Sequence, residues 1–341
     1  MRPYELELER PAETASGVLR TAPLVLIELA SEEGPVGRAY LRCYASVALE
    51  PLAQLVTGVG ELIVGGDADP ARVAAVLQRH FRLLGPQGLA GMAMAGIDMA
   101  LWDARARAEG VPLVVLLGGE PRPIPAYASL RTMSPAGAAA EAEEALGRGF
   151  DALKLKVGRG SLDDDLEAIR AVRSAVGDGV RLMVDYNQSL GVEEAISRAQ
   201  ALDAEDLHWI EEPTRGDDFA GHARIAAAAA TPVQLGESLW GPEDIEKAIA
   251  ARASDHLMLS AMKVGGVSGW LRAAALAEAA GLPVSSHTFP EFSAHLLGVT
   301  PACHLLEYLD HAGPILEQPV RVADGRVLPS EGPGAGVDWT V

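Results

Sequence analysis

The chain has 341 residues, 49% apolar and 22% charged, which is typical of a globular protein with a large core and excludes an intrinsically disordered one. Its formal net charge of −19 argues against nucleic acid or an anionic membrane surface as its partner. The two cysteines, Cys43 and Cys303, lie far apart in the sequence, which excludes a disulfide framework and a zinc site built on a CxxC motif.

Residues 1–120 predict a separate α+β domain. Residues 11–21 (PAETASGVLRT) are small and polar with little periodicity and indicate a mobile loop. Residues 21–30 (TAPLVLIELA) and 36–42 (VGRAYLR) are typical of antiparallel strands, and Met92–Glu109 carries apolar residues at helical spacing. The N-terminal residues lack the apolar stretch of a signal peptide, and no apolar run reaches the roughly 18 residues of a membrane span. We therefore expect a soluble cytoplasmic protein.

From residue 124 onward, short apolar runs alternate with Ala-rich amphipathic stretches. The apolar runs read IPAYAS, ALKLKV, RLMVDYN, LHWIEEP, PVQLGE, HLMLS, LPVSSH and CHLLEY. The stretches expected to be helical are Ala136–Arg148, Leu162–Val176, Glu193–Leu202, Pro242–Ala251 and Ser268–Ala280. Strands that alternate with helices imply a parallel sheet, and eight such strands favour a closed barrel over the alternative, an open doubly wound sheet.

We expect three segments along the chain. Residues 1–120 form the α+β domain, residues 121–314 form the barrel, and residues 315–341 form a C-terminal segment that packs back on the first domain. This last segment contains short strand-like pieces such as RVADGRVL.

Carboxylates end three successive barrel strands, and ligands bind at that end of a barrel. Asp185 ends one run, Glu211 and Glu212 end the next, and Glu237 ends the run after that. Each acid alone is typical of a solvated loop, but three converging carboxylates repel one another. A divalent cation relieves this repulsion, and Mg²⁺ prefers hard oxygen ligands. The residues therefore predict a Mg²⁺ site, and strand parity leaves open whether Glu211 or Glu212 takes part.

Lys154 and Lys156 end an earlier strand and share one of its faces because they are two residues apart. Both ammonium groups should enter the barrel mouth beside the cation, where each lowers the pKa of the other and the cation lowers both. A lysine whose pKa falls to about 7 to 8 can act as a general base, while its charged neighbour holds a substrate carboxylate. The alternative is an exposed pair on an edge strand, but a closed barrel has no edges.

Charge counting gives this site a chemical purpose. Three carboxylates, one Mg²⁺ and one protonated lysine sum to about zero, so a carboxylate substrate can enter. A proton on the carbon next to a carboxylate is very weakly acidic, and its removal requires positive charge already in place where the enediolate forms. We therefore expect a Mg²⁺-dependent enzyme that abstracts the α-proton of a small carboxylate.

Segments along the whole chain match one known family. They are TAPLVLIELA, AGIDMALWDA, LKLKVG, VDYNQSL, WIEEPT, GESLWGPE, AMKVGGVSGW, SSHTFPEFSAHLLG and HLLEYLD. On these segments the chain resembles the mandelate racemase subgroup of the enolase superfamily. The resemblance implies a (β/α)7β TIM-like barrel with an N-terminal α+β capping domain that the C-terminal tail completes, and a substrate flap at about residues 11–21. It also implies homo-oligomers, commonly octamers, and Mg²⁺ on Asp185, Glu211 and Glu237.

The resemblance further implies a role for each residue of the site. Lys156 is the base on one face of the substrate carbon, and His287 is the base on the opposite face. Lys154 holds and polarises the substrate carboxylate. The resemblance also implies that Asn187 contacts the α-hydroxyl group and that Ser129 contacts the carboxylate. Glu307 would donate a hydrogen bond to the enediolate.

The sequence departs from the family pattern at residue 260. In this subgroup the histidine pairs with an aspartate that ends the preceding strand, but Ser260 stands at that position here. A hydroxyl can orient the ring of His287 but supplies no charge to raise its basicity, so we expect a weaker base. Two residues expected to meet the substrate, Thr288 and the flap's one large apolar residue, Leu19, favour a polar substrate such as a sugar acid.

Other polar residues are expected to be structural. His208, His256 and His304 lie on apolar runs and are typical of hydrogen-bonded structural histidines. Lys263, in the segment KVGG, is expected to lie near the site in a turn that opens the next helix.

Three functions fit these residues. The first and favoured one is a racemase or epimerase of an α-hydroxy acid, which needs Lys156 and a competent His287 as bases. The second is an acid-sugar dehydratase, in which Lys156 removes the α-proton and His287, as an acid, helps a β-hydroxyl group to leave. The third is a non-catalytic metal- or ligand-binding protein, which the complete set of lysines, carboxylates and Glu307 argues against.

Overall fold

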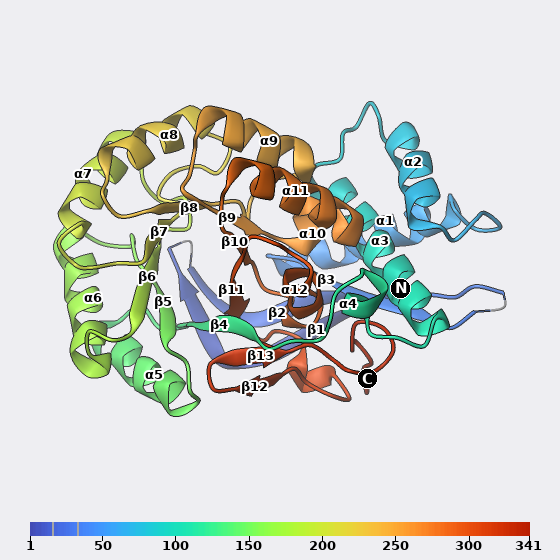
Figure 1. The fold of residues 1–341 in the computed structure, drawn as a ribbon, viewed down its shortest axis with the longest axis horizontal. Coiled ribbons are helices and arrows are strands. Elements are labelled where there is room, and N and C mark those ends of the chain that lie inside the picture. The colour runs from blue at the N-terminus through green and yellow to red at the C-terminus, as the bar shows by residue number, and fades with distance from the viewer. Residues whose placement is uncertain (16, 33) are drawn as a thin grey trace.

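Figure 1 shows the fold as a computed structural model, which describes residues 1–15, 17–32 and 34–341. In one part of the molecule, helices surround a barrel of strands. A smaller part with a three-stranded sheet and its own helices lies beside the barrel. Most of the smaller part comes first in the sequence, and the barrel strands follow it.

The barrel consists of eight strands in chain order. They are β4 (Ile124–Ser129), β5 (Ala152–Lys156), β6 (Arg181–Asp185), β7 (Trp209–Glu211), β8 (Val233–Leu235), β9 (His256–Leu259), β10 (Val284–Ser286) and β11 (Cys303–Tyr308). Each strand pairs in parallel with the next, and β11 closes the barrel on β4, with Leu306 opposite Ala126. The predicted closed barrel is confirmed, and the alternative of an open doubly wound sheet is wrong.

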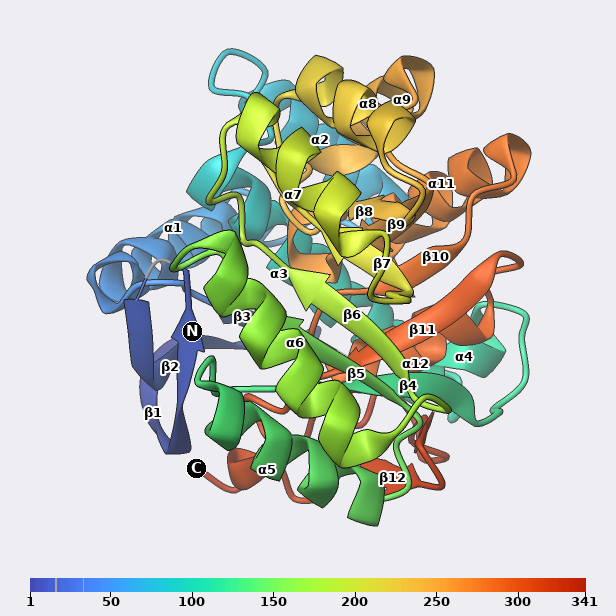
Figure 2. The same ribbon diagram turned by 90° about the vertical axis from the view of Figure 1, so that its left-hand side faces the viewer.

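Helices connect successive strands and cover the outside of the barrel (Figure 2). They are α5 (Pro135–Gly147), α6 (Leu162–Val176), α7 (Val192–Leu202), α8 (Phe219–Ala228), α9 (Gly241–Ala251), α10 (Ala261–Val264), α11 (Gly266–Ala280) and α12 (Pro290–Gly298). The start of α6 shows how the sequence begins a helix. The hydroxyl of Ser161 accepts a hydrogen bond from the amide of Asp164, whose carboxylate accepts one from the amide of Ser161.

The two-residue period of the strands aims the polar strand ends into the barrel. A fully buried layer fills the barrel interior and consists of Tyr127, Ala152, Met183, Trp209, Met258 and Leu305. Two positions beyond each of these residues, in the same order, lie Ser129, Lys154, Asp185, Glu211, Ser260 and Glu307, with Ser260 directly after the end of β9. These residues share the inward face, so apolar side chains fill the interior while polar side chains reach the mouth.

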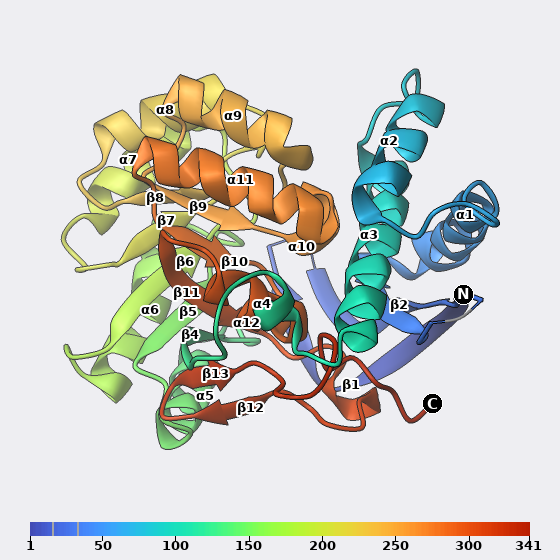
Figure 3. The same ribbon diagram turned by 45° about the vertical axis from the view of Figure 1, so that its right-hand side comes forward.

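The smaller part is an α+β cap, as predicted. Its strands are β1 (Arg2–Thr14), β2 (Gly17–Leu29) and β3 (Gly37–Arg42), and its helices are α1 (Leu49–Glu61), α2 (Pro70–His80), α3 (Gly88–Ala108) and the single turn α4 (Leu113–Leu116). Helix α3 is buried along much of its length because it packs between β3 and the barrel helices α10 and α11. Figure 3 shows α1, α2 and α3 together on the cap side of α10 and α11. In the part of the chain that the structure describes, no helix is both long and apolar enough to cross a lipid bilayer.

Residues 11–21 were predicted to form a loop, and this prediction is wrong because the segment consists largely of strand. The segment forms the end of a hairpin of β1 and β2, with Ala12 opposite Leu19, and residue 16 lies outside the described residues. The pairing register shifts between Glu7 and Ala12. Such an irregularity moves the following side chains to the other face, which explains why the sequence shows so little alternation.

The end of this hairpin contacts loops at the mouth of the barrel. The amide of Glu13 donates to the carbonyl of Arg131 (2.7 Å), and the Glu13 carboxylate accepts from the amide of Met133 (2.8 Å). Arg159, which follows β5, donates to the carbonyl of Thr14 (2.7 Å). These contacts place the hairpin next to the barrel mouth, where the substrate flap is expected.

The C-terminal residues contact both parts of the molecule. Strand β13 (Arg326–Leu328) pairs antiparallel with β4 of the barrel, and β12 (Arg321–Ala323) pairs with β13. Further along the chain, the carbonyl of Gly334 accepts a hydrogen bond from the amide of Leu113 in the cap (2.8 Å). The tail therefore connects the barrel to the cap.

Candidate active site

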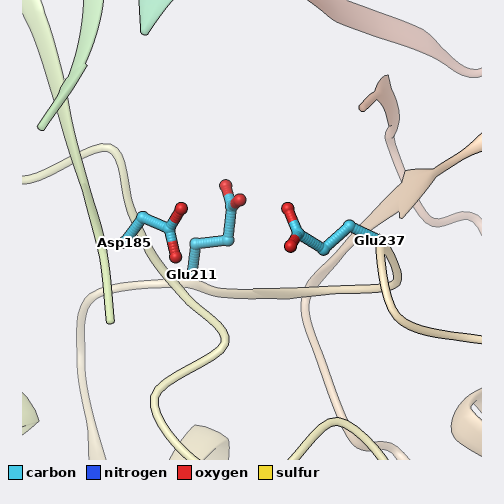
Figure 4. A group of neighbouring side chains, drawn as sticks. All are labelled: Asp185, Glu211 and Glu237. Atoms are coloured by element: carbon cyan, nitrogen blue, oxygen red, sulfur yellow. The ribbon is translucent and has the colours of Figure 1, made fainter. Parts of the chain in front are cut away.

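Three carboxylates from neighbouring strands converge at the mouth of the barrel (Figure 4). Asp185 ends β6, Glu211 ends β7, and Glu237 follows β8. One oxygen of each lies within 4.8 Å of the others, and Asp185 and Glu211 are fully buried. The position before Glu237 requires glycine: Gly236 has φ +143°, and a Cβ there would meet the carbonyl oxygen of Met258 at 2.2 Å. We call these three carboxylates the acidic trio.

The structure brings Glu211, and not Glu212, into the acidic trio. Oε2 of Glu211 accepts hydrogen bonds from the indole of Trp209 and the side-chain amide of Gln234, both at 3.1 Å. Glu212 has φ +35° and points elsewhere, where its carboxylate accepts a hydrogen bond from Gln188 Nε2 (2.7 Å). Strand parity left open whether Glu211 or Glu212 joins the trio, and the hydrogen bonds of each carboxylate hold Glu211 there.

The acidic trio fits a hard divalent cation. Burial raises the pKa of Glu211 well above its ordinary value, and Asp185 and Glu237 raise it further, against the lowering effect of Lys154. Three carboxylates so close together resist full ionisation within the chain alone. Because Mg²⁺ prefers carboxylate oxygen ligands, it would bind this donor set and restore the charge balance.

Lys154 lies at the centre of the acidic groups. Its Nζ is 2.5 Å from Glu211 Oε1, 2.9 Å from Glu307 Oε1 and 3.5 Å from Asp185 Oδ2, and the side chain is 1% exposed. Burial lowers the pKa of Lys154, but the surrounding acids outweigh it and raise the pKa well above its ordinary value. Lys154 is therefore an ammonium group and suits the binding of a carboxylate.

Lys156 lies beside the acidic trio and is held by two contacts. Its Nζ donates to Asp185 Oδ2 and to Asn187 Oδ1, both at 2.9 Å. Asn187 has φ +44°, and its own Nδ2 donates to Asp185 (3.0 Å). Burial and Lys154 lower the pKa of Lys156, but Asp185 and Glu237 raise it above its ordinary value. In the chain alone the acids therefore outweigh the second ammonium group, and the lowering expected with a bound cation stays a prediction.

Glu307 and Ser129 complete the inward-facing polar residues. Glu307 Oε1 contacts Lys154 Nζ at 2.9 Å, and its Oε2 accepts from the amide of Thr288 (3.1 Å). Burial raises the pKa of Glu307, but Lys154 outweighs burial and lowers it below its ordinary value. Within the chain alone Glu307 is thus ionised and accepts hydrogen bonds, unlike the donor that the resemblance implies. Ser129 Oγ is buried and has no partner among the described residues.

His287 follows β10 and contacts the acidic trio from one end. Its Nε2 lies 3.3 Å from Glu237 Oε2 and 4.0 Å from Glu307 Oε2. Its Nδ1 lies 3.4 Å from Ser260 Oγ, which is a weak hydrogen bond. Burial lowers the pKa of His287, although Glu237 and Glu307 act in the opposite direction. The ring is therefore neutral, and a hydroxyl rather than a carboxylate faces its Nδ1.

Thr288 and Leu19, the two residues expected to meet the substrate, lie in different parts of the molecule. Thr288 has φ +50°, its carbonyl accepts from Ser293 Oγ (2.7 Å), and its own hydroxyl is buried with no partner among the described residues. Leu19 lies on the hairpin in β2, is partly buried, and takes no part in the hydrogen bonds of the site. Thr288 thus has a free polar atom next to His287, whereas Leu19 is carried by the cap.

The cap also contributes residues that the sequence reasoning missed. The rings of Tyr44 and His287 stack with their centres 6.5 Å apart, and Lys263 Nζ lies 4.7 Å from the centre of the Tyr44 ring. Arg42 Cζ lies 5.2 Å from the same ring centre. Tyr40 and Arg42 were an available signal, because they share one face of the strand predicted at residues 36–42, and Tyr44 follows two residues after its end.

The three histidines expected to be structural meet at the other end of the barrel, where the strands begin. His208 Nε2 lies 3.0 Å from His304 Nε2, and the ring of His256 lies 5.0 Å from that of His304. Burial lowers the pKa of His208 to about 4 and that of His304 to about 3. These neutral rings lie away from the acidic trio.

Two family models match the chain. Residues 3–118 match the N-terminal domain of mandelate racemase and muconate lactonizing enzyme, and residues 137–340 match the family described as enolase C-terminal domain-like. The first match covers the cap, and the second covers most of the barrel and the C-terminal segment.

Individual proteins are similar to the chain over most of its length. The crystal structure of an enolase from Bradyrhizobium, complexed with magnesium and mandelic acid, is 44% identical, has a TM-score of 0.95, and is matched over 99% of this chain and 94% of that chain. The 3,6-anhydro-alpha-L-galactonate cycloisomerase of Streptomyces coelicolor is 30% identical over 96% of this chain and 92% of its own length. The L-talarate/galactarate dehydratase of Salmonella typhimurium is 34% identical over 74% of this chain and 64% of its own length.

Proposed function

Because this chain belongs to the mandelate racemase/muconate lactonizing enzyme family of the enolase superfamily, we propose that it removes the proton α to a carboxylate by a Mg²⁺-dependent route through an enediolate. The observation that carries the proposal is the placement of one base at each end of the acidic trio. Lys156 Nζ lies 2.9 Å from Asp185 Oδ2, and His287 Nε2 lies 3.3 Å from Glu237 Oε2. A substrate bound at the trio would present one face of its α-carbon to each base.

Positive charge at the acidic trio makes the reaction feasible. Mg²⁺ bound by Asp185, Glu211 and Glu237 would draw electron density from the substrate carboxylate and make the α-proton more acidic. Lys154 supplies a second positive charge, because the acids around it raise its pKa and keep it an ammonium group. Lys154 therefore binds the substrate carboxylate and stabilises the negative charge that develops when the α-proton leaves.

Proton transfer is assigned to Lys156 and His287. A cation bound at the acidic trio would offset the acids that raise the pKa of Lys156 and so favour its neutral form. Neutral Lys156 accepts the α-proton at Nζ, which lies 2.9 Å from Asn187 Oδ1. His287 accepts or returns a proton at Nε2 on the opposite face of the carbon, since burial lowers its pKa and keeps the ring neutral. The hydroxyl of Ser129, which has no partner among the described residues, is free to bind the substrate carboxylate. Glu307 contacts Lys154, which binds the same carboxylate.

Racemisation or epimerisation of an α-hydroxy acid is the overall reaction that two opposed bases support best. Dehydration of an acid sugar is the second candidate, and Ser260 favours it. Without a carboxylate at Nδ1, His287 is a poorer base, whereas delivering a proton to a departing β-hydroxyl group does not require a strong base. A non-catalytic binding protein is the third candidate, and the contact distances among the lysines and the acidic trio argue against it.

The decisive experiment is hydrogen exchange. Both enantiomers of a panel of 2-hydroxy acids and acid sugars are incubated with enzyme and Mg²⁺ in D₂O, and deuterium at the α-carbon is measured by NMR. Exchange from both enantiomers with interconversion supports the racemase. Exchange from one configuration with formation of a keto acid supports the dehydratase. Absence of exchange from every ligand that binds would contradict both reactions.

Ser260→Asp is expected to raise α-proton exchange for the enantiomer that faces His287. A carboxylate at residue 260, where the serine oxygen lies 3.4 Å from Nδ1, would raise the basicity of the ring. Contacts of this kind are typically worth about 10- to 100-fold. The rate for the enantiomer that faces Lys156 should change much less. Ser260→Asn is the matched control, because it has the same shape without the charge, and an equal rise in both variants would contradict the electrostatic explanation.

We also propose that the chain forms homo-oligomers in the cytoplasm and that its segments divide at residues 1–120, 121–314 and 315–341. Assembly is supported by large apolar side chains exposed on the cap, with exposed fractions of 83% for Val64, 100% for Leu83 and 70% for Leu84. Light scattering coupled to size-exclusion chromatography measures the mass in solution. A monomer at micromolar concentration would contradict the assembly.

A further inference from the structure

Three histidine side chains meet at the end of the barrel where the strands begin, opposite the acidic trio. His256 begins β9, His304 is the second residue of β11, and His208 directly precedes β7. These three are alternate strands of the barrel, and side chains from alternate strands share one layer of a barrel interior. We call the three side chains the histidine cluster.

Two nitrogens of the histidine cluster already lie at nearly the separation of two ligands of one metal ion. His208 Nε2 is 3.0 Å from His304 Nε2. Imidazole nitrogens bind Zn²⁺ at about 2.0–2.1 Å, so two of them in a tetrahedral shell lie roughly 3.3 Å apart. In the chain alone, one Nε2 carries a hydrogen and donates it to the other. If that ring carries its hydrogen at Nδ1 instead, both Nε2 lone pairs are available to a cation.

The third ring lies at the spacing that a three-histidine site requires. The ring centres are 5.1 Å apart for His208 and His304, 5.0 Å for His256 and His304, and 5.9 Å for His208 and His256. Rings that share a tetrahedral Zn²⁺ have their centres roughly 5 Å apart, given the same bond length. Among the described residues only the acidic trio brings three ligand atoms within 4.8 Å of one another, so the ring of His256 must rotate. The χ2 torsion of histidine is broad and permits this rotation.

His256 has a nitrogen that the described part of the chain leaves without a partner. Its Nδ1 is buried and takes part in no hydrogen bond there. Buried polar atoms are normally satisfied by protein, water or an ion, so each exception needs an explanation. A metal ion held by the cluster would engage this ring and give such an explanation.

The surroundings of His304 favour metal binding through its Nε2. Ser285 Oγ lies 3.4 Å from His304 Nδ1, a weak hydrogen bond. A histidine that binds a metal through one nitrogen normally donates the N–H of the other to an oxygen, and Ser285 supplies that oxygen. Burial also lowers the pKa of His208 to about 4 and that of His304 to about 3, so near neutral pH both rings keep a lone pair for a metal.

The charges around the histidine cluster permit a cation to bind. Arg181 is the cation that acts on the cluster, and it lowers the pKa of two of the rings. Its guanidinium, however, pairs with Asp151 Oδ1 at 2.8 Å. Asp255 acts in the opposite direction and raises the pKa of His256. The three rings are only partly buried, so an ion can reach them from solvent.

We propose that His208, His256 and His304 bind a borderline transition-metal ion such as Zn²⁺, which fastens the starts of β7, β9 and β11 to one another. A water molecule would complete the tetrahedral shell. Imidazole suits Zn²⁺, whereas Mg²⁺ prefers the carboxylates of the acidic trio. The barrel then has one metal site at each end. Trp209 lies between them, since its ring centre is 5.2 to 6.1 Å from those of the three histidines and its Nε1 donates to Glu211 (3.1 Å).

The test measures Zn²⁺ binding in a protein whose acidic trio is disabled. Metal-free Glu211→Gln protein is titrated with Zn²⁺ by calorimetry in buffer that contains excess Mg²⁺, and one equivalent of Zn²⁺ should bind at the histidine cluster. Adding His304→Gln should weaken this binding by at least about 100-fold, because loss of a residue that only supports a ligand already costs roughly 10- to 100-fold. His208→Gln and His256→Gln should have the same effect.

Two further measurements show which ligands hold the metal. Co²⁺ in place of Zn²⁺ should give the intense visible absorption of a four-coordinate ion, and His304→Gln should remove it. Zn²⁺ should also raise the Tm of the Glu211→Gln protein but not that of the double variant, because binding to the folded state alone stabilises it. A weak Co²⁺ spectrum, typical of six oxygen ligands, would overturn the site.

His80→Gln is the matched control, because His80 is an exposed histidine at the end of cap helix α2. It should leave the Zn²⁺ affinity within about threefold of the parent, a difference of about 0.65 kcal/mol. Equal Zn²⁺ affinity in His80→Gln and in the folded variants of the cluster would overturn the site. If one of those variants does not fold, the other two give the same comparison, and the Co²⁺ spectrum of the parent needs no replacement in the cluster. The histidine cluster lies apart from the reacting residues, so failure of this site leaves the proposed function standing.

Discussion

Lys156→Met is expected to lower kcat/KM for α-proton removal on the Lys156 face by about 10²- to 10⁴-fold, the range that a positioned general base contributes. Methionine keeps the length of the side chain and suits its environment, in which Lys156 is only 13% exposed. It has no nitrogen to accept the proton, and the contacts of Nζ with Asp185 and Asn187 are lost. Deuterium incorporation from D₂O into each enantiomer measures the effect.

The two faces of the substrate provide an internal control for this variant. Exchange of the enantiomer that faces His287 should persist in Lys156→Met, because His287 Nε2 contacts the other end of the acidic trio. Lys247→Met is the matched control, since Lys247 is a surface lysine with a 61% exposed side chain that pairs with Asp244. Equal losses for both enantiomers would show that Lys156 serves binding or structure rather than one face of the reaction.

Glu211→Gln is expected to weaken Mg²⁺ binding by at least about 100-fold and to lower activity at subsaturating Mg²⁺ in proportion. Loss of a residue that only supports a metal ligand costs roughly 10- to 100-fold in affinity, and loss of a charged ligand should exceed this. Glutamine retains the shape of the side chain but removes the charge that attracts the cation. Calorimetric titration of the metal-free protein with Mg²⁺ measures the affinity, and addition of EDTA should abolish activity in the wild type.

The neighbouring residue supplies a matched control for the metal ligand. Glu212→Gln makes the same chemical change one residue away, at a carboxylate bonded to Gln188 and Ser238 rather than turned into the acidic trio. Its Mg²⁺ affinity should stay within about threefold of the wild type, a difference of about 0.65 kcal/mol. If Glu212→Gln lost Mg²⁺ and Glu211→Gln kept it, the assignment of the trio would be contradicted.

Residues of the cap lie next to the catalytic histidine, although they are far from it in the sequence. Tyr44 stacks on His287, and Arg42 lies over the same tyrosine ring. A histidine base that lacks a carboxylate partner at Nδ1 therefore has an aromatic neighbour from the cap and a serine from the barrel. Whether the enzyme racemises or dehydrates depends on how this environment tunes His287, which the Ser260 variants test.

The local pattern of the sequence determined the barrel and the residue types at its mouth. Strand alternation and the recurring strand–helix length are properties of neighbouring residues, so they are visible without tertiary contacts. Helix α6 has the predicted bounds Leu162–Val176, and the parity of ALKLKV places Lys154 and Lys156 on the inward face. The hairpin at residues 11–21 was missed because a register shift removes the alternation on which a strand prediction depends.

Only the tertiary structure decided the finer chemistry of the site. It turned Glu211 rather than Glu212 towards Asp185, through hydrogen bonds from Trp209 and Gln234. It surrounded Lys156 with acids that raise its pKa in the chain alone, because that pKa depends on the summed charges of four strands and not on the adjacent lysine alone. It also placed the ring of Tyr44 from the cap against that of His287 from the barrel. Such contacts depend on how the cap docks on the barrel, and side-chain packing between distant segments leaves no local period in a sequence.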